Sequence, residues 1–201
     1  MTNQHLDCRA AAADAGLTDS RLEELSQVAR TTADLGGSVL MQHYGQLVSI
    51  QQKARAGDLV TDADLAAEKA VLTGLAEATP DIPVLAEESG ARGDVSDLCW
   101  CVDPLDGTTN FVHAFPFSCV SIGLAVKKKP VVGVVFNPIS NECFSAVVSH
   151  GATLNGKPIS VSKVSDLGKA LIGTEIGVSR DAATVDAIMG RVRACVENAR
   201  S

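Results

Sequence analysis

The stretch Trp100–Ser118 reads WCVDPLDGTTNFVHAFPFS and sets two carboxylates, Asp103 and Asp106, three positions apart. A short apolar run, Leu98–Val102, predicts a strand that delivers Asp103. Pro104 is expected to stop this strand, because proline has no N–H to donate to a ladder. The stretch therefore predicts a stiff turn that holds both carboxylates at the end of a strand.

The residues that follow Asp106 suit a phosphate group. Gly107 lets a ligand approach the backbone closely, and Thr108-Thr109-Asn110 adds hydroxyl and N–H groups. Magnesium prefers one or two carboxylates together with substrate phosphate oxygens, and N–H groups in a turn bind phosphate. The alternative is a hairpin turn at Asp106-Gly107, with Asp103 capping the strand end. An isolated Asp-Gly pair would favour that alternative, but the whole stretch fits a metal and phosphate site better.

The composition limits the classes of partner and of location. A net charge of -7 argues against nucleic acid as the main partner, because such binding depends on Lys and Arg neutralising phosphates. It does not exclude a small phosphorylated substrate, since bound Mg²⁺ can supply positive charge. No stretch approaches the ~20 apolar residues of a membrane span, and residues 1–20 lack the pattern of a secretory signal. The six cysteines form no Cys-x-x-Cys pair, so we expect free thiols in a reducing, cytoplasmic compartment.

Two amphipathic helices are predicted before this stretch. Apolar residues at helical spacing predict the first over about Arg21–His43, begun by a capping box of Ser20 and Glu23. The second is predicted from Leu65 to about Ala78, where a Thr-Pro pair ends it. Residues before position 20 are Ala-rich and show no core pattern, so we expect a loose N-terminal extension over residues 1–19.

Two further acids have both a structural and a functional interpretation. Thr61-x-x-Asp64 is a helix-capping pattern, which by itself explains Asp64 in the first turn of the second helix. Glu87 follows a short predicted strand, Ile82–Ala86, and acids in that position usually form a solvated turn. If this strand is buried beside the one that leads to Asp103, Glu87 arrives near Asp103 and adds a third carboxylate.

The second half of the chain is predicted to be rich in strands. Lys127-Lys-Lys-Pro130 reads as a solvated hairpin tip and Asn155-Gly156 as a hairpin turn. Residues 20–201 are expected to form one mixed α/β domain. The strands and the final helix are expected at Val120–Val126, Val131–Phe136, Cys143–Val148, Ala152–Leu154, Ile159–Val161, Ala170–Ile176 and, for the helix, Asp181–Val196.

The sequence resembles the inositol monophosphatase family, within the wider group of lithium-sensitive, Mg²⁺-dependent phosphatases. Three motifs in order carry the resemblance: DLVTDAD at 58–64, AEES at 86–89 and WCVDPLDGTTNFVH at 100–113. The third is similar to the family signature almost letter for letter, whereas the first two are weak alone. The resemblance runs from about Ser20 to the end of the chain and includes TEIG at 174–177.

The resemblance implies a role for each matching residue. It implies that Mg²⁺ is held by three carboxylates and one backbone carbonyl, those of Glu87, Asp103, Asp106 and Leu105. It implies that Gly107 and Thr108 bind the substrate phosphate through backbone N–H groups, next to Leu105, Asp106 and Glu87. The implied catalytic residues are Glu87 and Thr108, which activate the attacking water, and Asp64, which supports them. Lys53 would lie near an outer metal.

The resemblance also implies a fold and an activity. The fold would be the layered α-β-α-β-α sandwich of the inositol monophosphatase and fructose bisphosphatase type, and the protein would be a homodimer if that fold is complete. The activity would be hydrolysis of inositol monophosphate, a small phosphorylated polyol, by metal-activated water. The family carries a Trp-Asp motif near its C-terminus, whereas the single tryptophan here is Trp100. We therefore expect the second half of the sandwich to be incomplete and the chain to be C-terminally truncated.

Two other functions stay open on the sequence. One is a catalytically impaired truncated form that binds metal or dimerises without turnover, because the missing motif supplies a metal ligand in the family. The other is a related phosphatase acting on fructose bisphosphate, a nucleotide 3'-phosphate or histidinol phosphate. The run Phe111–Pro116 favours the monophosphatase branch over these relatives.

Overall fold

The computed structural model describes residues 3–46, 50–52, 59–174 and 180–199. The chain divides into two compact units. The first comprises Met1–Gln51 and Leu59–Ile159, and the second comprises Gln52–Asp58 and Ser160–Ser201. The prediction that 20–201 forms one domain stays a prediction, and each unit is described by itself.

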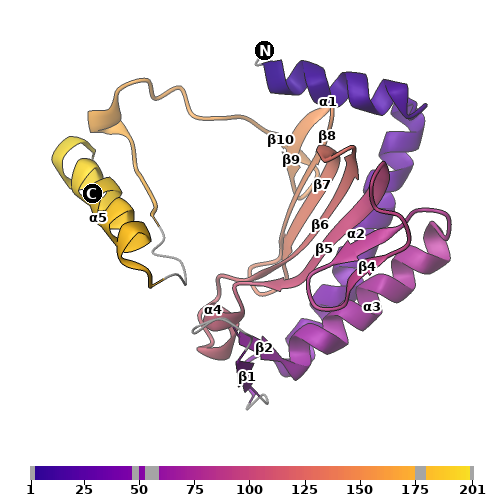
Figure 1. Ribbon diagram of the computed structural model, residues 1–201, viewed down its shortest axis with the longest axis horizontal. Helices are drawn as coiled ribbons and strands as arrows, with labels where there is room; N and C mark the ends of the chain where they lie inside the picture. The colour runs from indigo at the N-terminus through magenta and orange to yellow at the C-terminus, as the bar shows by residue number, and fades with distance from the viewer. Residues whose placement is uncertain (1–2, 47–49, 53–58, 175–179, 200–201) are drawn as a thin grey trace. The chain divides into compact units, whose positions relative to one another are not determined.

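An eight-stranded sheet dominates the first unit, with the strand order β10-β9-β8-β7-β6-β5-β3-β4 (Figure 1). Neighbouring strands run antiparallel except β3 and β5, which pair in parallel. The strands are β3 (Val84–Ala86), β4 (Gly90–Arg92), β5 (Leu98–Asp106), β6 (Cys119–Val126), β7 (Lys129–Asn137), β8 (Glu142–Val147), β9 (Gly151–Leu154) and β10 (Lys157–Ile159).

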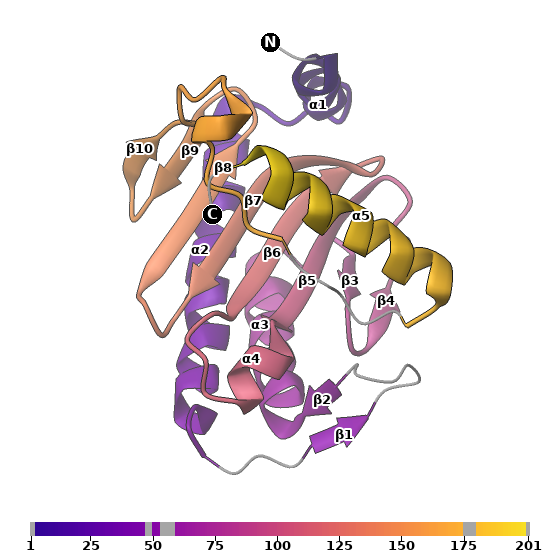
Figure 2. The same cartoon turned by 90° about the vertical axis from the view of Figure 1, so that its left-hand side faces the viewer.

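Two helices, α2 (Asp19–His43) and α3 (Asp62–Ala78), pack on one face of this sheet, behind it in Figure 2. Every second residue of β6 is buried, as expected for a strand with one covered face. The Trp100 side chain on β5 is fully buried, and its Nε1 donates to Thr79 Oγ1 at 3.0 Å. This bond satisfies the indole N–H inside an otherwise aliphatic core. The predicted mixed α/β class and both predicted helices are thus confirmed.

Short elements lie between the longer helices and strands. A two-stranded pair, β1 (Ile50–Gln52) and β2 (Leu59–Thr61), precedes α3, and α4 (Thr108–Val112) follows β5.

The predicted hairpin turn at Asn155-Gly156 is confirmed: both residues have positive φ, and Leu154 pairs with Lys157 across it. The predicted tip after β6 is confirmed in the same way by positive φ at Lys127 and Lys128.

The second unit contains a 3₁₀ turn, η1 (Leu167–Lys169), and one helix, α5 (Ala182–Asn198). The Asp181 side chain caps α5 by accepting from the Thr184 N–H at 2.9 Å. The strand predicted over Ala170–Ile176 is wrong in its described part, 170–174, where only an isolated bridge at Leu171 occurs. None of the helices in the described residues has the length and apolar character needed to cross a membrane.

The N-terminal segment differs from its prediction. Residues Asn3–Asp14 form a helix, α1, which contacts β7, and Ala11 and Ala12 belong to the buried core. Alanine has the highest helix propensity and its small side chain allows close packing, so an Ala-rich segment forms a helix without large apolar residues. The cap of α2 also differs: Thr18, not Ser20, accepts the Arg21 N–H, at 3.2 Å.

The strand β5 does not end at Pro104. It continues to Asp106, and its pairing with β6 shifts register between Asp103 and Asp106. Proline is tolerated at such an irregularity, because the ladder there needs no N–H from it. The predicted stop is therefore a β-bulge, and the turn comes one residue after Asp106, at Gly107.

A substitution at Gly37 of α2 tests how closely this helix packs on the sheet. A Cβ at Gly37 would lie 2.6 Å from Cε1 of Phe136. We expect Gly37→Ala to lower the free energy of unfolding by about 1–3 kcal/mol, because the ring and the helix must move apart. Gly190→Ala in α5 is the matched control, since nothing lies within 4 Å of a Cβ there. Urea unfolding followed by circular dichroism compares the variants, and equal stabilities would contradict the close packing.

Candidate metal and phosphate site

The parallel pairing of β3 with β5 brings two acids to the same end of the sheet. Ala86 pairs with Val102, so the next residues along the two strands are Glu87 and Asp103. The Glu87 N–H donates to the Val102 carbonyl at 2.9 Å, which extends the pairing by one bond. The condition under which Glu87 was expected near Asp103 is therefore met.

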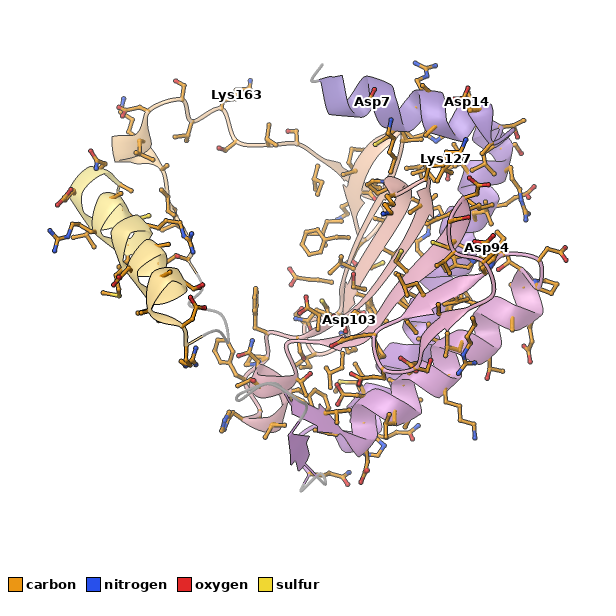
Figure 3. The ribbon with its side chains drawn as sticks, in the orientation of Figure 1. Asp7, Asp14, Asp94, Asp103, Lys127 and Lys163 are labelled. Carbon is orange, nitrogen blue, oxygen red and sulfur yellow. The ribbon has the colours of Figure 1, made fainter. Side chains whose placement is uncertain are left out.

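The bulge in β5 lies between Asp103 and the other acid, Asp106. The Leu105 N–H donates to Asp103 Oδ1 at 3.1 Å, so the side chain of Asp103 spans the bulge at Pro104. Asp106 pairs with Cys119 of β6 after the register shift. Figure 3 shows Asp103 near the point where the sheet gives way to α4.

The electrostatics of Asp103 reveal crowding among the three acids. Burial first, and then the neighbouring Glu87 and Asp106, together raise the pKa of Asp103 to about 8, although the hydrogen bond from the Leu105 N–H opposes this rise. A carboxyl that holds its proton up to that pH lacks a compensating positive charge. A divalent cation beside Asp103 would supply it and return the carboxyl to its ionised form.

Gly107 has a backbone conformation and a close neighbour that disfavour any residue with a side chain. Its φ is +85°, and a Cβ there would lie 2.9 Å from the Phe117 carbonyl oxygen. Gly107 is also the N-cap of α4, which begins at Thr108. The first N–H groups of a helix have no partner within it, so this turn offers N–H donors beside the acids.

Asp64 connects this turn to α3. Its carboxylate is buried, with 1% of the residue exposed, and it accepts the Thr61 N–H at 2.8 Å and the Thr61 hydroxyl at 2.6 Å. Its other oxygen, Oδ1, accepts the Thr108 hydroxyl at 3.1 Å. Burial raises the pKa of Asp64, and the hydrogen bonds from Thr61 and Thr108 oppose that rise. Asp64 therefore caps α3, as its structural interpretation predicts, and also contacts Thr108 at the start of α4.

The Thr108 hydroxyl has two acceptors and one proton. It lies 3.1 Å from Asp64 Oδ1 and 3.0 Å from the Leu105 carbonyl oxygen. A hydroxyl donates one proton at a time, so these acceptors compete for it. When the proton goes to Asp64, the Leu105 carbonyl is free to bind a cation.

The comparisons with known proteins bear on this arrangement. Residues 21–199 match the model of the inositol monophosphatase family. The chain belongs to this family. It is 45% identical over 185 residues to inositol monophosphatase 2 of Solanum lycopersicum, covering 90% of this chain and 69% of that protein. It is 46% identical to inositol-1-monophosphatase of Synechocystis sp., covering 80% of this chain and 56% of that protein.

Solved structures of inositol monophosphatase relatives share the fold. The extragenic suppressor protein suhB from Bartonella henselae superposes with a TM-score of 0.80 at 34% identity, covering 87% of this chain and 67% of that one. The inositol monophosphatase from Anabaena superposes with a TM-score of 0.62 at 37% identity, covering 74% and 53%. The chain thus spans roughly half to two thirds of these relatives.

The carboxylate and carbonyl oxygens of the candidate site suit a hard cation, but only some of them point toward one common position. Carboxylate and carbonyl oxygens are the ligands that Mg²⁺ prefers. In the part of the chain that the structure describes, no group of three His, Cys, Asp or Glu side chains has the arrangement of a metal site. The charge interactions of Asp103 nevertheless involve both Glu87 and Asp106. The donor chemistry of this inositol monophosphatase relative therefore fits the ion, and Lys53 lies outside the described residues.

Two residues beside the site were not predicted from the sequence. The Cys119 thiol lies 3.9 Å from Asp106 Oδ2, and burial, then the charges of Asp106 and Asp103, raises its pKa to about 12. The thiol therefore stays protonated and faces Asp106 as a weak donor. Glu68, in α3, accepts the Glu88 N–H at 2.9 Å. Its signal in the sequence was its position four residues after Asp64, on the same helix face.

The pKa of Asp103 predicts how metal-free stability depends on pH. The unfolded chain loses this proton near the ordinary value of 3.8, whereas the folded chain holds it to about 8. The folded state binds more protons in this window, so the free energy of unfolding falls as the pH rises from about 4 to about 8. Asp103→Asn should flatten this fall, as measured by urea unfolding with a chelator present.

An exposed aspartate provides the control for that measurement. Asp94 is fully exposed, and hydrogen bonds from Ser96 lower its pKa. Asp94→Asn should leave the decline between about pH 4 and pH 8 as it is in the unsubstituted chain. A decline that Asp103→Asn does not change would contradict the crowding of carboxylates at the site.

Proposed function

We propose that this chain is a Mg²⁺-dependent phosphatase that hydrolyses inositol monophosphate to inositol and phosphate. The observation that carries the proposal is the crowding of Asp103 with Glu87 and Asp106 beside the Gly107 turn. Carboxylates at that position suit a cation, and the turn offers N–H donors to an anion, so we infer that the two together bind a phosphate ester.

The proposal assigns the oxygen donors to the ion. Glu87, Asp103, Asp106 and the Leu105 carbonyl would hold Mg²⁺, and Lys53 would lie near an outer ion. When bound, Mg²⁺ would supply the positive charge that the phosphate and its leaving oxygen need during hydrolysis. This charge also explains how a chain with a net charge of -7 accepts an anionic substrate.

The remaining residues would bind phosphate and orient water. The N–H groups of Gly107 and Thr108 would bind phosphate oxygens at the start of α4. The Thr108 hydroxyl can accept a hydrogen bond from water while it donates to Asp64 Oδ1, 3.1 Å away. Burial raises the pKa of Asp64, which makes it a better proton acceptor than an exposed aspartate. Glu87 would be the second acceptor for the attacking water.

The substrate class rests on relatives. The two relatives with 45% and 46% identity are named inositol monophosphatases. A solved structure titled inositol monophosphate bound SaIMPase-II superposes with a TM-score of 0.67 at 25% identity. These names support a small phosphorylated polyol over the other phosphate esters considered from the sequence.

The family resemblance extends the proposal to assembly and location. We infer a lithium-sensitive homodimer in the cytoplasm. All six cysteines are free, which agrees with a reducing compartment. Sedimentation of the purified chain tests the dimer directly, and a monomer at every concentration would contradict it.

Asp103→Asn tests the proposed ion site. We expect it to lower Mg²⁺-dependent phosphate release from inositol monophosphate by at least about 100-fold, a loss typical for one essential electrostatic contact. Asp94→Asn, at an exposed site remote from Asp103 in Figure 3, should keep the unsubstituted rate. Equal rates in both variants would refute the site. Metal binding without turnover in the unsubstituted chain would favour the catalytically impaired form.

Thr108 tests the proposed handling of water. Thr108→Val removes the hydroxyl but keeps the shape, and we expect phosphate release to fall by about 100-fold. Thr108→Ser keeps the hydroxyl and should retain most of the activity. The comparison of kcat at saturating Mg²⁺ separates the hydroxyl from ion binding. A serine variant as inactive as the valine variant would argue against a role for the hydroxyl.

A further inference from the structure

Two buried carboxylates on α3 point to two different parts of the site. Asp64 has 1% of its surface exposed and Glu68 has 4%. They are four residues apart, so they occupy one face of the helix, about one turn from each other. Asp64 accepts from Thr108 in α4, and Glu68 accepts from Glu88, which follows β3.

The hydrogen bond from the Glu88 N–H to Glu68 restrains the backbone next to Glu87. The Glu87 N–H donates to Val102 of β5 at 2.9 Å, and the next N–H, that of Glu88, donates to Glu68 Oε2 at 2.9 Å. Two consecutive amides are thus bound by two different elements, the sheet and the helix. This leaves the peptide between Glu87 and Glu88 little rotational freedom, and that peptide sets the direction of the Glu87 side chain.

A buried glutamate is a costly way to fill a core position. The residues around Glu68 on the same helix face are Ala67, Val71 and Leu72, all buried. Placing a carboxylate there carries a desolvation penalty, which a hydrogen bond from one N–H offsets only in part. An apolar residue would give the helix more stability, so the carboxylate at Glu68 calls for a role beyond packing.

We propose that Glu68 is a positioning residue that holds Glu87 in the orientation needed for cation binding, an inference that rests on the proposed function. In this arrangement α3 acts as a rigid spacer between the two sides of the site. Asp64 fixes the start of α4 and Glu68 fixes the end of β3. Glu68 itself contacts neither the ion nor the substrate.

The test compares three substitutions of Glu68 with a control on the same helix. Glu68→Gln keeps an oxygen that can accept the Glu88 N–H, whereas Glu68→Leu removes the acceptor and keeps the size. Glu68→Asp keeps the charge but is one methylene shorter. Glu77→Gln is the control, because Glu77 is exposed near the end of α3.

The expected readouts concern Mg²⁺ rather than stability alone. Isothermal titration with Mg²⁺ should give a Kd about tenfold higher for Glu68→Leu and for Glu68→Asp, in line with the loss of a partner that orients a metal ligand. Glu68→Gln and Glu77→Gln should stay within about twofold of the unsubstituted chain. At saturating Mg²⁺, the KM for the phosphate ester should be unchanged.

Amide exchange at Glu88 separates this inference from the proposed function. Without metal, the Glu88 amide should exchange faster in Glu68→Leu than in Glu68→Gln, because only glutamine retains the acceptor. An unsubstituted chain that binds Mg²⁺ but releases no phosphate would refute the proposed function and leave the positioning role standing. Unchanged Mg²⁺ affinity in Glu68→Leu and Glu68→Asp would overturn the positioning role. If Glu68→Leu fails to fold, Glu68→Asp against Glu68→Gln decides it.

Discussion

The parallel hydrogen bonding between β3 and β5 is the constraint on which the site depends. Parallel strands end at the same edge of a sheet, so Glu87 and Asp103 emerge together one residue beyond the pair Ala86 and Val102. An antiparallel pair would have carried the two acids to opposite edges. Because β3 and β5 lie next to each other, a few backbone bonds determine the spacing of the acids, and the bulge in β5 then adds Asp106.

The parallel pairing of β3 and β5 also makes ionisation of Asp103 unfavourable, and a bound cation would remove this penalty. Burial and neighbouring charge raise the pKa of Asp103 to about 8, so the ionised form of this carboxyl is unfavourable at the end of β5 when no cation is bound. In the apolar part of the same strand, Trp100 is fully buried and its indole N–H donates to Thr79 Oγ1. Strand β5 therefore has a buried apolar part around Trp100 and an end where the ionised form of Asp103 is unfavourable.

Much of the fold followed from periodicity and turn chemistry, and the failures have physical causes. Helix spacing predicted α2 and α3, and Asn155-Gly156 predicted a hairpin. The alanines of α1 escaped prediction because their burial depends on close backbone approach to β7 rather than on apolar size. The prediction that Pro104 ends the strand was wrong because a β-bulge accommodates the proline, and a bulge depends on the partner strand β6. Glu68 was not predicted because its partner is a backbone N–H, and its position four residues after Asp64 does not reveal that partner.

Asp64 shows why structural and functional interpretations of a residue need not compete. The capping box with Thr61 engages Oδ2, which leaves Oδ1 directed at Thr108. The bonds that begin α3 are thus the bonds that orient the carboxylate toward Thr108. The start of the helix and the contact with Thr108 therefore depend on the same carboxylate. A residue that orients a neighbouring side chain can therefore look like an ordinary helix cap in the sequence, as Asp64 does.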